Sequence, residues 1–186
     1  MQKNRWALFA YKIPSEPSSI RVRVWRNLKT LGVHYLQQSV CIFPHKEDII
    51  KKVKKLQLLI LENGGETTFL EFENLSKSSE EDLIQAFNEE RISEYEEFMK
   101  ETERFLQEME QETLDMDFSF REIEENEAAL ERMKKWFDKI KKRDFFHCDM
   151  QKLAEEKLQE CSARFEKFME EVYSREGLID NGPKNS

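Results

Sequence analysis

The sequence predicts an α+β protein with a ferredoxin-like β-α-β-β-α-β domain at residues 1–76, an antiparallel three-helix bundle at 77–178 and a disordered tail at 179–186. Short β-type apolar runs alternate with helical periodicity in the first part. In the second part apolar residues recur only at helical spacing. The charge divides in a similar place. Residues 1–60 carry 12 bases and 3 acids, a balance of +9, and residues 61–186 carry 18 bases and 35 acids, a balance of −17.

Six elements are expected in the first domain. Two short β-type runs that flank Gln37-Gln38-Ser39 predict a hairpin or a bulged strand pair. The last strand alternates through Thr68, Leu70 and Phe72, which predicts that these three side chains share one face. In order, the expected elements are a strand at 5–14, a helix at 20–31, strands at 33–36 and 40–43, a helix at 48–62 and a strand at 66–73.

Three amphipathic helices are expected after residue 77. Ser78 and Glu81 have the spacing of a capping box, and the helix that they open runs to about residue 112. Ser119 opens a second helix, which ends in a basic turn at 139–143. Asp149 is expected to cap the third helix, which Gly177 closes. Short loops between the three stripes favour antiparallel packing.

The composition excludes several classes of protein. No run approaches the roughly 18 apolar residues of a membrane span, and the N-terminus lacks an apolar signal core. Cys41, Cys148 and Cys161 form no Cys-x-x-Cys pair, which favours a cytoplasmic protein with free thiols. P-loop, dinucleotide-binding and nucleophile-elbow motifs are absent, and no His or Cys pair has ligand spacing. We therefore expect neither an enzyme nor a metal or cofactor site.

Two helices of the first domain each carry a basic face. Exposed bases in this arrangement could contact the phosphates of DNA, with a salt dependence that grows with each phosphate neutralised. Two alternatives stay open: the face could dock the acidic helices of this chain or of a second subunit, or it could simply be solvated. The candidate DNA-binding residues are Arg21, Arg23, Arg26, Lys29, Lys51, Lys52 and Lys55, with Lys54 beside them.

A second candidate site lies in the turn before the last helix. His147 and Cys148 stand there, next to Asp149. Because helix N-termini bind anions, an oxyanion could bind at this turn. The alternative is an ordinary loop in which Asp149 acts only as the helix cap.

Four stretches of the chain together resemble one known family. They are Leu8-Phe9-Ala10-Tyr11-Lys12-Ile13-Pro14; Glu16-Pro17-Ser18-Ser19 running through Arg26 and Gly32 to Tyr35-Leu36-Gln37-Gln38-Ser39-Val40-Cys41; Phe87-Asn88-x-Glu90-Arg91 with Glu94-Tyr95; and Trp136-Phe137-x-Lys139-Ile140 to Arg143-Asp144-Phe145-Phe146. These residues resemble the N-terminal domain of the chromate-resistance protein ChrB family. The resemblance covers most of residues 5–173.

The resemblance implies a DNA-binding transcription regulator of chromate resistance, with chromate or another oxyanion as effector. It also implies that the helical half mediates dimerisation or couples to a partner. Longer members carry a second, C-terminal domain, which this chain is expected to lack. The alternative is a non-enzymatic interaction module whose basic and acidic halves pair within or between protomers.

The first domain is also similar to the central domain of PaaX-type phenylacetate-catabolism repressors and to the small ferredoxin-like nucleases of CRISPR adaptation. Those nucleases place an acidic metal ligand at the end of the first strand. This chain has Tyr11-Lys12-Ile13 there, and an ammonium group cannot ligate Mg²⁺. We therefore do not expect a metal nuclease.

Overall fold

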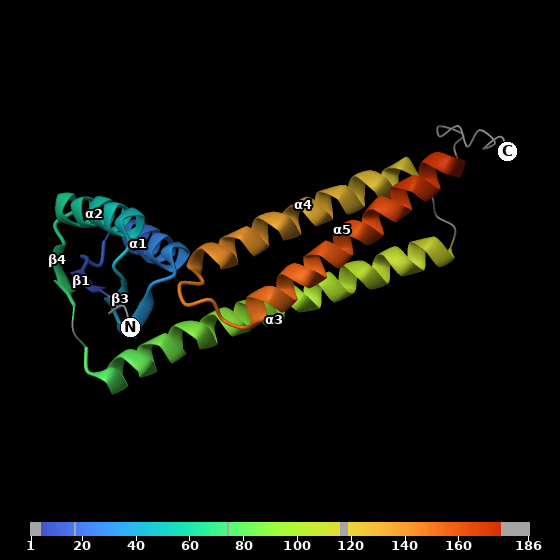
Figure 1. The fold of residues 1–186 in the computed structure, drawn as a ribbon. Helices are drawn as coiled ribbons and strands as arrows, with labels where there is room; N and C mark the ends of the chain where they lie inside the picture. Colours follow the sequence, from blue (N-terminus) through green and yellow to red (C-terminus); the bar gives the residue numbers. More distant parts are fainter. Residues whose placement is uncertain (1–4, 17, 74, 116–118, 176–186) are drawn as a thin grey trace. The chain divides into compact units, whose positions relative to one another are not determined.

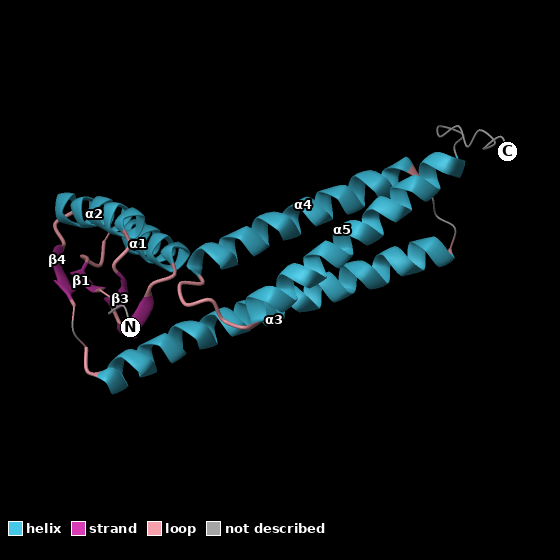
Figure 2. Cartoon of the chain, in the orientation of Figure 1, coloured by secondary structure: helices cyan, strands magenta, loops and turns pink. Residues whose placement is uncertain are grey.

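The computed structural model describes residues 5–16, 18–73, 75–115 and 119–175. The predicted tail at 179–186 and the helix end at Gly177 lie outside these residues. The chain divides into two compact units, Met1–Phe87 and Asn88–Ser186. A four-stranded antiparallel sheet and five helices confirm the α+β class (Figures 1 and 2). No helix in the described ranges is long and apolar enough to span a membrane.

The first unit, Met1–Phe87, contains the sheet. The strand order is β2-β3-β1-β4, and every neighbouring pair is antiparallel. The register between β2 and β3 shifts between Tyr35 and Gln37, which confirms a bulged strand pair. The elements are β1 (Trp6–Lys12), α1 (Ser18–Leu31), β2 (His34–Gln37), β3 (Val40–Pro44), α2 (Glu47–Glu62), β4 (Glu66–Phe72) and the first turns of α3 (Lys77–Leu114).

An aromatic core forms on the sheet face that α1 and α2 cover. Phe9 of β1 and Phe43 of β3 are fully buried, and the Phe69 ring lies 6.5 and 6.4 Å from them, centroid to centroid. Thr68, Leu70 and Phe72 lie on the other face of β4, and Leu70 is 53% exposed there. The antiparallel register places Phe69 opposite Phe9, so the other alternating set of β4 faces the helices.

The opposite face of the sheet meets the start of α3 within the same unit. The indole N–H of Trp6 donates a hydrogen bond to Glu80 Oε1 at 3.3 Å. The Phe87 ring lies 6.0 Å from the Trp6 ring and 5.6 Å from that of His34. The first turns of α3 therefore pack on the sheet, and the unit boundary falls inside this helix.

The predicted start of α3 is corrected by two residues. Ser76, and not Ser78, accepts a hydrogen bond from the backbone N–H three residues ahead, that of Ser79, at 3.2 Å. Ser78 lies inside the helix, which begins at Lys77. The Ser-x-x-Glu pattern at 78–81 is thus matched by chance in a serine-rich stretch.

The second unit, Asn88–Ser186, contains the remainder of α3, α4 (Phe120–Arg143) and α5 (Met150–Arg175). Ser119 caps α4 as predicted, because its Oγ accepts the Glu122 N–H at 3.3 Å. Side chains from all three helices form one hydrophobic cluster, with Phe98 at its centre 5.6 Å from the rings of Trp136 and Phe137. Apolar stripes at helical spacing are buried here against one another.

Candidate nucleic-acid interface

The two helices of the first unit leave their bases exposed and bury their apolar stripes. Val24 and Leu28 of α1 are fully buried, so this stripe of the helix faces the core. Arg23 and Arg26, one position before and two positions after Val24, therefore lie on the outward side of the helix. The pattern of α2 is similar, with Val53 and Ile60 fully buried. All of the predicted bases on α1 and α2 are exposed.

A groove of about 630 Å³ runs between α1 and α2. It brings together Arg23 from α1 with Lys52 and Lys55 from α2, and one acid, Glu62, stands at its edge. Apolar and amide side chains form the rest of the wall: Asn27, Thr30, Leu31, Leu56, Leu58 and Leu59. Three predicted bases therefore converge although they are separated by about 30 residues in the chain.

The bases differ in how far other groups compensate their charge. Lys51 pairs with Glu47 at 3.7 Å across highly exposed side chains, which is a weak interaction. The Lys29 and Lys54 ammonium groups lie over the rings of Trp25 and Phe69, at 5.1 and 6.0 Å from the centroids. By contrast, no ion pair among the described residues involves the four bases that we term the α1–α2 cations: Arg23, Arg26, Lys52 and Lys55.

The basic character belongs to this face and not to the whole unit. Residues 1–87 hold 13 bases and 10 acids, a balance of only +3. Six of the acids, Glu66, Glu71, Glu73, Glu80, Glu81 and Asp82, lie in β4, just after it or in the first turns of α3. The bases of α1 and α2 thus form a one-sided positive surface.

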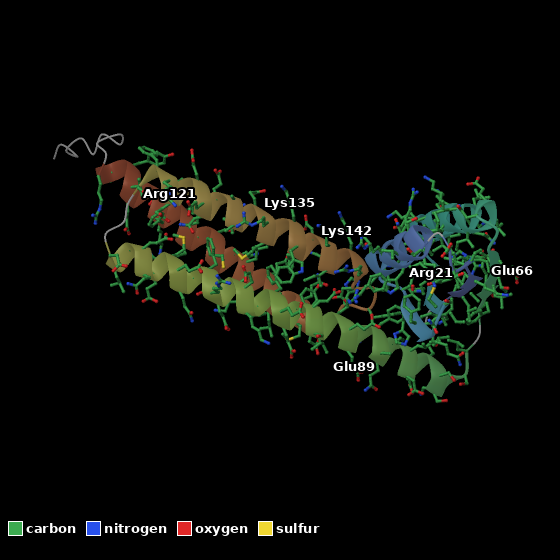
Figure 3. The ribbon with its side chains drawn as sticks, turned by 180° about the vertical axis from the view of Figure 1, so that it is seen from behind. Arg21, Glu66, Glu89, Arg121, Lys135 and Lys142 are labelled. Atoms are coloured by element: carbon green, nitrogen blue, oxygen red, sulfur yellow. The ribbon has the colours of Figure 1, made fainter. Side chains whose placement is uncertain are left out.

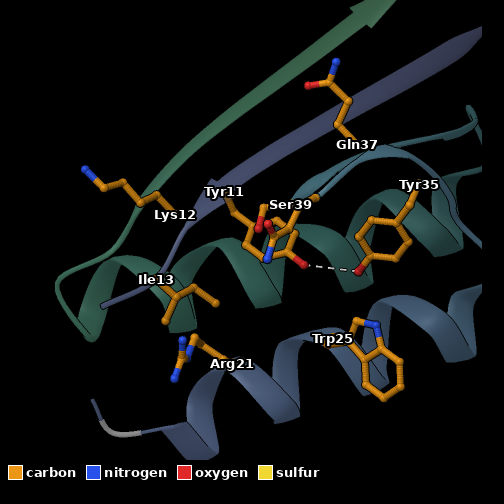
Figure 4. Close-up of a pocket in the computed structure, with 9 residues that line it drawn as sticks. Tyr11, Lys12, Ile13, Arg21, Trp25, Tyr35, Gln37 and Ser39 are labelled. Carbon is orange, nitrogen blue, oxygen red and sulfur yellow. Dashed lines mark hydrogen bonds between the residues drawn. The ribbon is translucent and has the colours of Figure 1, made fainter. Parts of the chain in front are cut away.

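Arg21 is separated from the α1–α2 groove. It lines a different pocket together with Tyr11 and Tyr35 of the sheet and Trp25 of its own helix (Figure 4). The predicted DNA-binding residues therefore lie at two separate sites, the α1–α2 groove and the pocket that Arg21 lines. Only the tertiary structure shows this separation. The aromatic members of the pocket were not predicted as site residues.

The turn that holds His147 and Cys148 offers little to an anion. Cys148 is buried, and its backbone N–H already donates to Asp144 Oδ1 at 3.1 Å. Burial and, next, the Asp144 carboxylate raise the pKa of the Cys148 thiol. His147 is exposed with φ of 55°, in the left-handed region. The anion site stays a prediction, and this geometry favours the alternative of an ordinary turn.

A buried polar network at this end of the second unit was missed by sequence reasoning. Asp144 Oδ2 accepts the Tyr95 hydroxyl at 3.3 Å. Arg91, only 5% exposed, contacts Glu94 at 3.5 Å, and Glu94 accepts a 2.9 Å hydrogen bond from Arg143. The i, i+3 spacing of Arg91 and Glu94 was the available signal. The described ranges contain no group of three or more His, Cys, Asp or Glu side chains placed to hold a metal ion.

Comparison with known proteins adds one finding. The sequence model of the family described as "Protein ChrB, N-terminal" matches residues 21–178. This range includes α1 from Arg21 onward and the whole of α2, α3, α4 and α5. No curated protein and no solved structure matches the chain.

Proposed function

Because the chain belongs to the ChrB N-terminal family, we propose that it is a regulatory protein of the chromate-resistance type that binds DNA through α1 and α2. Family membership relates the chain to chromate-resistance proteins. One observation supports the DNA-binding part: three of the α1–α2 cations, Arg23, Lys52 and Lys55, converge on a groove, and none of the four forms an ion pair within the described chain. Bases placed in this way are available for phosphate oxygens.

The expected binding is electrostatic and salt-dependent. Each phosphate that a base neutralises adds about −0.9 to the slope of log K against log salt. If the four α1–α2 cations each contact a phosphate, a rise from 50 to 200 mM salt weakens binding on the order of 100-fold. The negative balance of the second unit, 17 bases against 28 acids, opposes DNA and makes this salt dependence an essential test.

The experiment compares two charge-reversal variants with the wild type. Fluorescence anisotropy of a labelled operator-region duplex is measured at both salt concentrations. Arg23→Glu/Arg26→Glu should weaken binding at least tenfold at 50 mM salt and flatten the slope. The matched control is Arg132→Glu/Lys135→Glu, which has the same i, i+3 spacing and the same charge change on exposed residues of α4 (Lys135 is labelled in Figure 3).

Comparison of the two variants distinguishes DNA binding by the α1–α2 face from a general effect of the protein's net charge on DNA binding. Equal losses in both variants would show that only the total charge matters. Absence of binding by the wild type at 50 mM salt would refute DNA binding by this chain.

The second candidate function is an interaction module in which acidic helices occupy the basic groove. The net charge of −11 on residues 88–186 favours it, because opposite charges attract within or between protomers. In this case the wild type would not bind DNA, and analytical ultracentrifugation would show a dimer that dissociates as the salt concentration rises.

Several finer points are part of the same proposal. We assign the sheet unit to the ferredoxin-like class on its β-α-β-β-α-β order and β2-β3-β1-β4 sheet. The shared core of α3, α4 and α5 supports an antiparallel three-helix bundle that serves dimerisation. The protein is proposed to be non-enzymatic and cytoplasmic, and an oxyanion effector stays a prediction.

A further inference from the structure

A second pocket of the first unit, about 530 Å³ in volume, lies between α1, the end of β1 and the β2–β3 turn. Figure 4 shows Tyr11 and Tyr35 reaching into it from the sheet, with Arg21 and Trp25 on the side of α1. The volume falls within the range of roughly 300–1,000 Å³ that is typical of small-molecule sites. A bare tetrahedral oxyanion, the size of a few water molecules of about 30 Å³ each, would leave most of it unfilled.

The charged groups of the pocket are all positive. Lys12 and Arg21 line it, and no acid does. Lys12 also contacts Glu66 at 3.8 Å, but both side chains are about 80% exposed, so water screens this pair. Arg21 forms no ion pair within the described part of the chain. The pocket therefore favours a ligand with an anionic group.

The aromatic groups provide a flat surface. Trp25 is 47% exposed, although it is a large apolar side chain, and Lys29 holds its ring by a cation–π contact. The hydroxyls of Tyr11 and Tyr35 lie 3.2 Å apart. Burial raises the pKa of both hydroxyls, so both keep their protons at neutral pH. One of them donates within the pair, and the other therefore has a hydrogen left for a ligand acceptor.

The β2–β3 turn adds exposed polar side chains on a backbone that is tied to β1. Gln37, Gln38 and Ser39 line the pocket, and Ser39 adopts a left-handed φ of 63°. The Tyr11 N–H donates to the Ser39 carbonyl at 3.0 Å, which ties the turn to the end of β1. Side-chain amides can both donate to and accept from the edge of a nucleobase.

We propose that this pocket binds a nucleotide, with the base on Trp25 and the tyrosines, its edge against the β2–β3 turn at Gln38, and its phosphate against Arg21; Figure 4 shows the Lys12 and Gln37 side chains directed away from these groups. Cations alone would accept any anion, whereas an aromatic surface with amides at its edge adds the chemistry that recognises a base. The nucleotide could be free or be one residue of a single strand. The proposal is independent of duplex binding by the α1–α2 cations.

The test is isothermal titration of the full chain with 5′-AMP, ribose 5-phosphate and adenosine. The expected result is that AMP binds at least tenfold more tightly than either fragment. Trp25→Ala should weaken AMP binding by roughly 5- to 150-fold, the range measured for loss of one stacked base. Arg21→Gln should weaken AMP binding but leave adenosine binding unchanged.

The matched control is Arg23→Gln, an exposed arginine two residues along the same helix that does not line the pocket. Arg23→Gln should leave AMP binding unchanged and weaken duplex binding. Failure of the nucleotide proposal can therefore be distinguished from failure of the duplex-binding proposal. If a single-stranded oligonucleotide binds more tightly than AMP, the ligand is a nucleotide within a single strand. If AMP binds more tightly than the oligonucleotide, the ligand is a free nucleotide. Equal binding of AMP and ribose 5-phosphate, no binding of either AMP or the oligonucleotide, or loss of AMP binding in Arg23→Gln but not in Trp25→Ala would overturn the proposal.

Discussion

Gly65 lies at a tight crossing between the end of α2 and the end of β1, and its replacement should destabilise the first unit. A Cβ atom on Gly65 would lie 2.5 Å from the Lys12 carbonyl oxygen and 2.5 Å from Ile60 Cγ2. Ordinary contacts between such atoms are about 3.5–4.0 Å, so the chain would have to open by roughly 1 Å. Ile60 is fully buried, and Lys12 is in register with Glu66 in the sheet, so neither can withdraw freely.

Gly65→Ala should therefore reduce the free energy of unfolding by about 2–3 kcal/mol, at the upper end of the usual range for overpacking. The neighbouring Gly64 is the matched control, because it has φ of +73° but no atom within 4 Å of an added Cβ. Gly64→Ala should cost about 1–2 kcal/mol from its backbone conformation alone, and Gly64→Asn less, since Asn tolerates the left-handed region. Asn at position 65 should be at least as harmful as Ala.

The assay is equilibrium unfolding in urea, followed by the fluorescence of the buried Trp6. A Trp25→Phe/Trp136→Phe background leaves this residue as the single indole, so the signal reports the first unit. If Gly65→Ala is no less stable than Gly64→Asn, the close approach of Gly65 to β1 does not constrain the fold, and the reasoning is refuted.

Two further predictions concern the cores. Phe98→Ala should destabilise the second unit by about 3–5 kcal/mol, because Phe98 is fully buried. Leu153→Ala, at a 49% exposed position, should cost less than about 1 kcal/mol. Both are measured by urea unfolding followed by Trp136 fluorescence in a Trp6→Phe/Trp25→Phe background, in which the single indole lies in the second unit. Burial raises the pKa of Cys41 to about 12 and that of Cys161 to about 11, so Ellman's reagent at pH 8 should label neither thiol until the protein unfolds. Both pKa values lie above the ordinary thiol pKa of 9, which applies in the unfolded chain. The stabilisation that these neutral thiols contribute should therefore be complete below pH 9 and decline as the pH rises towards 12. Urea unfolding at pH 8 and at pH 10.5 measures this loss. Labelling of the folded protein at pH 8, or unchanged stability at pH 10.5, would contradict this interpretation.

The elements of this protein were largely predictable because their signals are local. The buried residues of α1 and α2 recur at helical spacing, and Ser119 caps α4 through a hydrogen bond to a residue only three positions away. The face of β4 could not be predicted in the same way. Both alternating sets of this strand contain apolar residues, and only its pairing with β1 decides that Phe69, and not Leu70, is turned to the helices.

For the basic face and the nucleotide pocket, too, the sequence determines one part and the tertiary structure another. Periodicity alone determined that the arginines and lysines of α1 and α2 are exposed, because the opposite stripe of each helix must be buried. Only the packing of the two helices decided that Arg23 meets Lys52 and Lys55. The sheet register and the β2–β3 turn likewise decided that Arg21 faces two tyrosines. Sequence spacing specifies a face within one element, whereas a site made by several elements depends on which faces are buried against each other.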